Sequence, residues 1–216
     1  ERLSGLTNLN SLMISNYGTN SVRVTSISAC KEMPLKELLL KYVDVDGANV
    51  ISEFQRLEDL YCTTEELFRR APSGLRVLYV EDAKFKGDVD LNRFSMIETL
   101  GLLNVKCASI QGLSSLTALK SLQLVGVPAK NLSDMKLCSR LKSLEICNCR
   151  EFDGKFNVAD FKSLPLENLV LENVPLNRIQ GLEDCPLKNL RIDGEGIESI
   201  NNICRLPNFE RLDVAN

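Results

Sequence analysis

The sequence predicts an α/β solenoid, in which short parallel strands stack into one long sheet and turns or short helices return the chain behind it. Three observations predict this fold. A nine-residue phrase recurs, as in "LKSLQLVGV" from Leu119 and "LKSLEICNC" from Leu141; its leucines alternate; and it returns at a nearly constant interval. Self-similarity at a period of about 20–50 residues is the sequence signature of repeat architectures.

The repeated phrase has the form L-x-x-L-x-L and occurs ten times along the 216 residues. Successive copies lie 18 to 26 residues apart, and 22 is the commonest interval. The copies start at Leu9, Leu35, Leu57, Leu75, Ile97, Leu119, Leu141, Leu166, Leu187 and Phe209. We therefore predict a single solenoid of about ten repeats over residues 1–216.

Each copy is expected to contain one short strand, because L-x-L alternation places two leucines on the same face of an extended chain. The next strand then stacks beside it in parallel at about 4.8 Å. Each coil buries its leucines against its neighbours, which makes the array cooperative. Pro34, Pro165 and Pro186 each lie just before a strand, where a residue need not donate to the sheet.

The segments that return the chain differ where the interval departs from 22. The 18-residue step contains "TTEELFRRAPSG", in which Thr64 can cap a short helix that ends before Pro72 and Gly74. The two longest steps contain Tyr17–Ser28 and Arg150–Phe161. Insertions in solenoids emerge as loops, so we expect loops at both places.

The full template, LxxLxLxxVxxxxIxxLxx, resembles the leucine-rich repeat family over nearly the whole chain. The resemblance implies a right-handed superhelix with a curved parallel sheet on its concave face and short helices, 3-10 turns and loops on its convex face. The family usually carries asparagine three residues after the last strand leucine. The positions here hold Val43, Val105, Val127, Cys149 and Val174, with Tyr17, Ala83 and Glu195 in other copies. The chain thus resembles the cysteine-containing or internalin-like subclasses, and its turns must satisfy their backbone groups in another way.

Both ends of the sequence lack a recognisable cap. Leu3, Leu6 and Leu9 are already in register at the start, and the chain stops just after a strand. Open solenoid ends expose leucines and normally carry polar caps. We therefore expect a fragment that lacks one or both caps.

Composition argues against several functions. The chain has no histidine, no Gly-rich phosphate loop and no G-x-S-x-G motif, so we expect no enzyme and no cofactor. The 26 basic and 29 acidic residues are dispersed, which disfavours nucleic-acid binding. No apolar run approaches the ~20 residues of a membrane helix, so we expect no membrane insertion within this chain.

The eight cysteines are scattered without a CxxC pair, so we expect no metal site. Cys62, Cys138 and Cys149 fall on core positions of the template, where cysteine acts as a small hydrophobe. Cys147 lies just after a strand and is expected to be exposed, which leaves a reactive or disulfide-forming role open. The cysteine pattern favours a reducing compartment and hence the cytoplasm, with the cell surface or secretion as alternatives.

The residue between the two strand leucines is free to specify a partner, because it points away from the core. Along the array this column reads Met13, Leu39, Tyr61, Tyr79, Gly101, Gln123, Glu145, Val170, Arg191 and Asp213. Its first four members are large and apolar or aromatic, and tyrosine is enriched at interface hot spots. The candidate partner-binding residues are Met13, Leu39, Lys41, Tyr42, Tyr61, Tyr79 and Glu81. Aromatic residues also favour strands without any partner, so local packing remains the alternative.

We therefore expect a non-enzymatic protein-recognition module that binds a protein partner on its concave face. The alternative is a structural or ligand-sensing segment of a larger receptor or effector, in which the repeats pack against another domain of the same chain.

Overall fold

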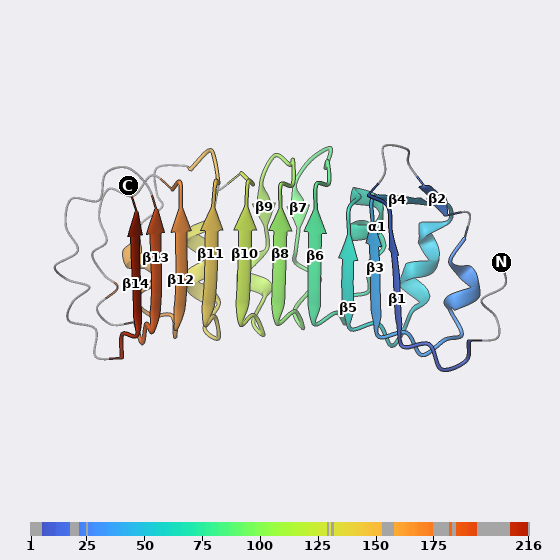
Figure 1. Cartoon of the computed structure of the whole chain (residues 1–216), viewed down its shortest axis with the longest axis horizontal. Coiled ribbons are helices and arrows are strands. Elements are labelled where there is room, and N and C mark those ends of the chain that lie inside the picture. The colour runs from blue at the N-terminus through green and yellow to red at the C-terminus, as the bar shows by residue number, and fades with distance from the viewer. Residues whose placement is uncertain are drawn as a thin grey trace.

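Ten strands form one parallel sheet that runs the length of the chain (Figure 1). The computed structural model describes residues 6–17, 22–24, 26–128, 130, 132–152, 158–174, 182, 185–193 and 208–215. The strands are β1 (Ser11–Ser15), β3 (Glu37–Lys41), β5 (Asp59–Cys62), β6 (Val77–Glu81), β8 (Thr99–Leu103), β10 (Ser121–Val125), β11 (Ser143–Cys147), β12 (Asn168–Glu172), β13 (Asn189–Asp193) and β14 (Arg211–Ala215). Each strand pairs with the next copy of the repeat, as the sequence predicts.

The register of the sheet follows the leucine template without a slip. Met13 is paired with Leu39, Leu39 with Tyr61, Tyr61 with Tyr79 and Tyr79 with Gly101. The flanking leucines alternate to the other face, where Leu38 and Leu60 are each 1% exposed. A one-residue slip would turn the leucines out to solvent, so burial fixes this register.

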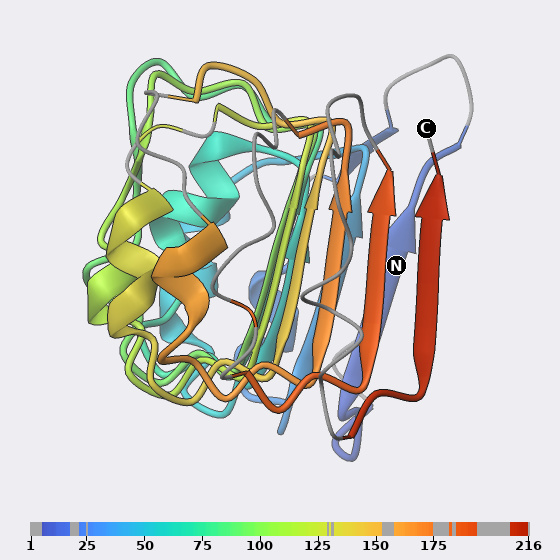
Figure 2. The ribbon, with the colours of Figure 1, turned by 90° about the vertical axis from the view of Figure 1, so that its left-hand side faces the viewer.

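Short helices cover one face of the sheet, and the other face is bare and concave (Figure 2). The end strands β1 and β14 lie farther from the helical layer than the central strands do, which gives the sheet its curvature. The covering elements are η2 (Ser28–Cys30), η3 (Ala48–Glu53), α1 (Glu65–Arg70), η4 (Leu113–Ser115), η5 (Leu132–Leu137) and η6 (Val158–Phe161), with the small pairs β2 (Val22–Val24)–β4 (Val43–Val45) and β7 (Val89–Asp90)–β9 (Ile110–Gln111). None of these helices is long and apolar enough to cross a membrane.

The α-helix of the short coil begins where the sequence predicts. The hydroxyl of Thr64 accepts the backbone N–H of Leu67 at 3.3 Å, which caps the first turn. Arg69 and Arg70 occupy the last turn, where cations are favourable to the helix dipole. The helix ends at Arg70, before Pro72, and Leu67 and Phe68 anchor it in the core.

The turn after each strand satisfies its backbone through a column of residues with left-handed conformation. Five of its members are Asp82, Asn104, Gly126, Asn148 and Asn173, all with positive φ. Each donates its backbone N–H to the carbonyl of the last strand residue in the following coil, at 2.7–2.9 Å. Asparagine and aspartate tolerate this conformation better than other side chains. An asparagine-rich column therefore exists one position before the place where the family pattern led us to look for it, and the small apolar residues fill the buried corner next to it.

The prediction that Cys147 is exposed is wrong. It is the last residue of β11 and only 4% exposed, because its small side chain lies between the longer side chains of Glu145 and Glu172 on the same face. Burial and the neighbouring carboxylate of Glu145 raise the pKa of the thiol to about 12. At neutral pH the group is a protonated thiol, which is a poor nucleophile.

Cys62, Cys138 and Cys149 are buried, as predicted for core positions. Of the two predicted loops, the first includes β2 and a buried Ile27, and the second lies mostly outside the described residues. The expectation that the chain is a fragment without caps stays a prediction.

Candidate partner-binding surface

Four large side chains lie side by side on the bare face over β1, β3, β5 and β6. Met13 is 67% exposed, and Leu39, Tyr61 and Tyr79 are half-buried. The rings of Tyr61 and Tyr79 stack with their centroids 6.0 Å apart and their planes 20° from parallel. Such offset stacking of aromatic pairs contributes stability beyond the burial of their surface.

Gly101 provides the space in which the Tyr79 ring lies. A Cβ atom at this position would come within 2.2 Å of the ring carbon Cδ1 of Tyr79. The ring therefore lies flat over β8, where the other strands carry a side chain. Among the described strands, this places the aromatic pair at the boundary between the large apolar part of the column and its polar part.

Lys41 joins the aromatic residues at the carboxyl ends of the strands. Its ammonium group lies 2.6 Å from the carboxylate of Glu81 and donates to the hydroxyl of Tyr61 at 3.3 Å. The Tyr61 hydroxyl in turn donates to the Glu81 carboxylate. The ammonium nitrogen also lies 5.2 Å from the ring centroid of Tyr42 and 5.8 Å from that of Tyr17, within cation–π range.

These contacts shift the pKa values of the network. The hydrogen bond to Glu81 raises the pKa of Lys41, and burial opposes part of that effect. Burial, followed by the hydrogen bond to Glu81, raises the pKa of Tyr61 to about 12. At neutral pH the lysine is therefore a cation and the phenol is neutral, and both donate to the same carboxylate.

Tyr42 belongs to the left-handed column although it is a bulky residue, with φ of 55°. Its backbone N–H donates to the hydroxyl of Thr63 at 3.0 Å, and its phenol donates to Asp82 at 2.5 Å. That hydrogen bond is the first cause that raises the pKa of Tyr42 to about 12. The side chain is 37% exposed, so it forms one wall of the surface.

Tyr17 is a member of this cluster that our sequence reasoning missed. It is 78% exposed, and its ring meets the ring of Tyr42 edge-to-face at 6.5 Å. The available signal was its place in the first copy of the repeat, at the corner position that small buried residues occupy elsewhere. A tyrosine is too large for that corner.

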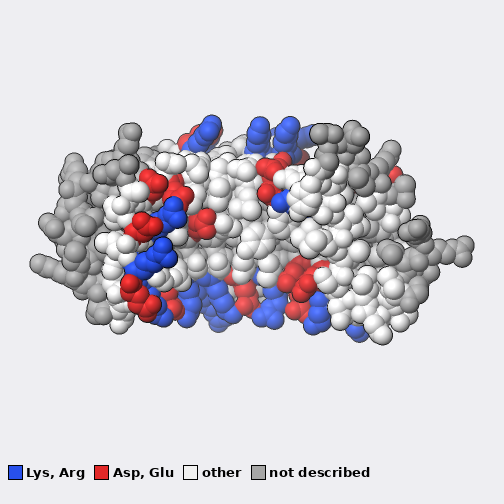
Figure 3. All heavy atoms as spheres, viewed as in Figure 1, with Lys and Arg blue, Asp and Glu red and all other residues white. Residues whose placement is uncertain are grey.

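Acidic side chains flank this cluster on two sides. Glu37 and Asp59 lie at the amino-terminal ends of β3 and β5, and Glu81 and Asp82 lie at the carboxyl end of β6. Figure 3 shows acidic atoms at both margins over these strands and uncharged atoms between them. A shallow hollow of 190 Å³ lies between Met13, Leu39, Tyr61 and Tyr79 and extends to Glu37 and Asp59.

We call this region the tyrosine surface and define it by Met13, Leu39, Lys41, Tyr42, Tyr61, Tyr79 and Glu81. The structure brings all seven residues together on four adjacent strands and the turn that follows β3. Met13 lies at one end of the column, and the other six surround Lys41 and the stacked rings.

Comparisons with known proteins agree on the architecture. No protein-family model matches the sequence, and no curated protein matches it either. A leucine-rich repeat protein of Leptospira interrogans superposes with a TM-score of 0.60 at 19% identity, over 98% of this chain and 68% of its own. An internalin (inlF) of Listeria monocytogenes does so with a TM-score of 0.52 at 19% identity, over 99% of this chain and 76% of its own.

The chain is a leucine-rich repeat solenoid.

The plant peptide hormone receptor RGFR1, solved in complex with RGF2, shares the same leucine-rich repeat fold. It superposes with a TM-score of 0.57 at 16% identity, over 99% of this chain but only 41% of the receptor. The fold predicted from the template is thus confirmed. At these identities the likeness extends to the fold alone.

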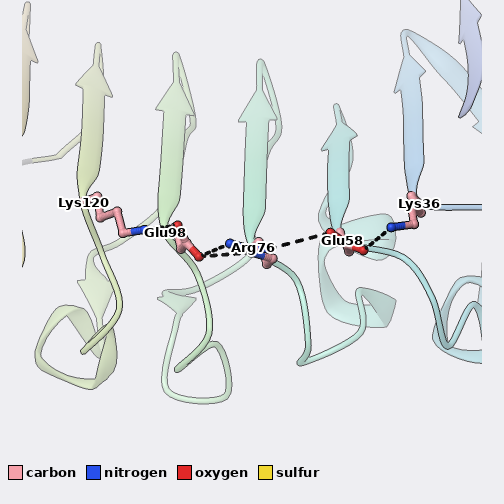
Figure 4. A network of polar contacts seen from close by, with 5 residues as sticks. All are labelled: Lys36, Glu58, Arg76, Glu98 and Lys120. Carbon is pink, nitrogen blue, oxygen red and sulfur yellow. Dashed lines mark hydrogen bonds and ion pairs between the residues drawn. The ribbon is translucent and has the colours of Figure 1, made fainter.

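A ladder of ion pairs runs along the edge of the leucine-rich repeat sheet where the strands begin (Figure 4). Lys36 lies 2.9 Å from Glu58, Glu58 lies 4.0 Å from Arg76, and Glu98 bonds both Arg76 and Lys120. A second ladder joins Lys142, Glu167 and Lys188 at 2.7 Å each. Sequence reasoning missed both ladders, although the alternating signs stand in one column, directly after the first leucine of each copy.

The later repeats present a polar surface. Arg191 lies 2.9 Å from Glu172 and 3.9 Å from Asp213, across three adjacent strands. Within the described residues, no three histidine, cysteine, aspartate or glutamate side chains converge in a way that could hold a metal ion. The second half of the sheet therefore carries charge pairs where the first half carries aromatic rings.

Proposed function

We propose that this leucine-rich repeat chain is a non-enzymatic protein-recognition module whose tyrosine surface binds one segment of a protein partner. The observation that carries the proposal is the stacked pair of Tyr61 and Tyr79, half-exposed on the bare face of the sheet between two acidic margins. Exposed aromatic surface with a polar rim is a common form of interaction site.

The rings are held in place before any partner arrives. Tyr61 is fixed by Lys41 and Glu81, and Tyr79 is fixed by the stack and by the space over Gly101. A side chain that is already ordered loses little conformational entropy on binding. Preorganised tyrosines of this kind are therefore suited to act as binding hot spots.

The charges around the rings suggest what the partner carries. An apolar or aromatic side chain would fill the hollow beside Leu39, and basic side chains on either side of it would face Glu37, Asp59 and Asp82. Glu81 is already paired with Lys41, so the remaining carboxylates supply most of the attraction. We therefore propose a partner segment with a large apolar residue flanked by lysine or arginine.

Two further facts support a binding role over catalysis. The chain contains no histidine, and the thiols of Cys62 and Cys147 are buried with pKa values raised to about 12. One of the structural neighbours is a peptide hormone receptor solved with RGF2, which makes peptide binding on this fold a reasonable proposal here.

Selection from a phage-displayed random peptide library tests the proposal. We expect the wild-type chain to enrich peptides with an apolar or aromatic residue flanked by lysine or arginine. In isothermal titration calorimetry, a double variant Tyr61→Ala, Tyr79→Ala should bind a selected peptide at least about tenfold more weakly. High salt should weaken the wild-type complex, because the flanking charges contribute to it.

The matched control is the double variant Gln123→Ala, Val170→Ala, which shortens two residues of the same column on later strands. It should bind the peptide as the wild type does, and circular dichroism should show both variants folded. Peptides that both double variants retain equally would show that the tyrosine surface is not the site. If the wild type enriches no peptide, the surface does not recognise a short segment, and the alternative of packing against another domain is favoured.

A further inference from the structure

The short coil leaves a hollow beside α1 at the edge of the sheet where the strands begin. Its coil spans 18 residues from Leu57 to Leu75, whereas four of the next five intervals in the array hold 21 or 22. The hollow has a volume of 910 Å³ and is lined by the chain from Gln55 to Glu58 and from Arg69 to Gly74, together with Lys36, Ser52 and Arg93. That volume is in the range of about 300–1,000 Å³ that small-molecule sites occupy.

The lining is strongly basic. Its charged side chains are Lys36, Arg56, Arg69, Arg70 and Arg93, with Glu58 as the only carboxylate among the lining residues. Glu58 lies 2.9 Å from Lys36 and 4.0 Å from Arg76, and the bond to Lys36 is the first cause of its lowered pKa. Figure 4 shows Glu58 pointing along the sheet edge toward these two cations. Its charge is thus already balanced.

Two of the arginines build the wall of the hollow. Arg93 donates to the backbone carbonyls of Phe68 and Ala71 at 2.5 Å each, and its guanidinium stacks 4.3 Å from the Phe94 ring centroid. Arg69 lies 2.6 Å from Glu65, one helical turn away. These contacts fix the C-terminal end of α1 against the next coil.

The remaining two arginines are available to a ligand. Arg56 and Arg70 are exposed, and neither has a hydrogen bond or ion pair with another described residue. They enter the hollow from different elements, Arg56 from the turn before β5 and Arg70 from the last turn of α1. A guanidinium group presents a planar fork of donors that matches a phosphate in two places.

We propose that this hollow, which we call the arginine pocket (Lys36, Arg56, Arg69, Arg70 and Arg93), binds a small phosphorylated ligand. Arg56 and Arg70 bind the phosphate groups, and Lys36 adds charge from the strand β3. Ser52, Gln55 and Ser73 line the same hollow and offer hydrogen bonds to hydroxyl groups. No aromatic side chain lines the hollow, so it offers a nucleobase nothing to stack on, and a phosphorylated sugar or polyol fits it better.

Isothermal titration calorimetry at low ionic strength, with fructose 1,6-bisphosphate as the probe, tests the proposal. We expect binding at one site per chain. The double variant Arg56→Gln, Arg70→Gln should weaken binding at least about tenfold. The control variant Arg140→Gln, Lys162→Gln removes the same charge at exposed positions of later coils and should bind as the wild type does.

Inorganic phosphate and uncharged fructose complete the experiment. If the bisphosphate binds more tightly than inorganic phosphate, the ligand is an organic phosphate; equal binding points to free phosphate, and both results support the pocket. The proposal is overturned if neither anion binds, if fructose binds as tightly as its bisphosphate, or if the control variant loses binding to the same extent. Thermal denaturation of both variants confirms that the substitutions leave the fold intact.

Discussion

Gly101 and Tyr79 act as one unit, because the ring of the tyrosine occupies the space that a side chain at Gly101 would fill. The rest of the concave column obeys a simpler rule, in which each strand contributes one side chain and neighbours lie about 4.8 Å apart. At this one step the column omits a side chain, and the ring extends over two strands. The geometry of the aromatic stack therefore depends on a residue that makes no contact of its own.

We expect Gly101→Ala to displace the Tyr79 ring without unfolding the chain. The new Cβ would overlap the ring, which stands on the open face and can turn outward. The unfolding free energy should stay within about 1 kcal/mol of wild type. Near-ultraviolet circular dichroism should show the loss of the stack, and a selected peptide should bind more weakly. An unchanged aromatic spectrum would contradict the structure at this position.

The tyrosines of the network should ionise late. The pKa values of Tyr42 and Tyr61 are raised to about 12, above the ordinary value of about 10. Their neutral forms stabilise the native state, so this contribution is complete below about pH 10 and is lost as the pH rises toward about 12. A spectrophotometric titration of the native protein should show this late component. Tyr42→Phe and Tyr61→Phe should each remove part of it, and a titration complete near pH 10 would contradict the network.

At the scale of single elements, the turn after each strand is set by a left-handed residue whose N–H bonds the next coil. Asparagine, aspartate or glycine holds this place in most described coils, and Tyr42 is the bulky exception. A bulky residue in this conformation is strained, by about 1–3 kcal/mol in typical cases. The strain is compensated by the bond of its N–H to Thr63 and of its phenol to Asp82.

A pair of substitutions at Tyr42 separates backbone strain from side-chain contacts. Tyr42→Asn suits the left-handed conformation but loses the phenol bond, so its unfolding free energy should stay within about 1 kcal/mol of wild type. Tyr42→Val loses the same bond and keeps the strain, because β-branched residues are poorly suited to positive φ. Urea denaturation should show Tyr42→Val less stable than Tyr42→Asn by at least about 1 kcal/mol. Equal stabilities would rule out strain at this turn.

The elements also show how far the sequence alone leads. The register of the column from Met13 to Tyr79 was predictable, because a repeating leucine pattern fixes which side chains share a face. Cys147 was misplaced because its exposure depends on the two longer glutamates beside it, which the template does not describe. The hub at Lys41 and the arginine pocket depend on side-chain conformations and on the shape of the short coil, and neither is set by a repeating pattern.

At the scale of the whole molecule, the array is nearly one-dimensional, since each coil is buried by its two neighbours. Leu100 in the central strand β8 is fully buried, whereas Leu212 in β14, at the edge of the described sheet, is 38% exposed at the equivalent template position. The same leucine therefore has a different structural weight in different coils.

Truncation of these two leucines should differ in its effect on stability. Leu100→Ala should lower the unfolding free energy by about 2–5 kcal/mol, because it leaves a cavity between two packed coils. Leu212→Ala should lower it by less than about 1.5 kcal/mol, because its surface is already partly in solvent. Urea denaturation of both variants measures the difference. Equal losses would mean that the last described strand is covered as well as the central ones.

The charge ladder at the strand starts adds a restriction on how such an array can change its length. Signs alternate from coil to coil through Lys36, Glu58, Arg76, Glu98 and Lys120, so each coil is matched only by neighbours of opposite sign. Deletion of the coil that carries Arg76 would bring Glu58 beside Glu98, whereas deletion of two successive coils would restore the alternation. Recombination between repeats therefore meets least electrostatic resistance when it adds or removes coils in pairs. The junction of Lys120 with Lys142 is different, because like charges already stand there and a single new coil with an acidic residue would fit.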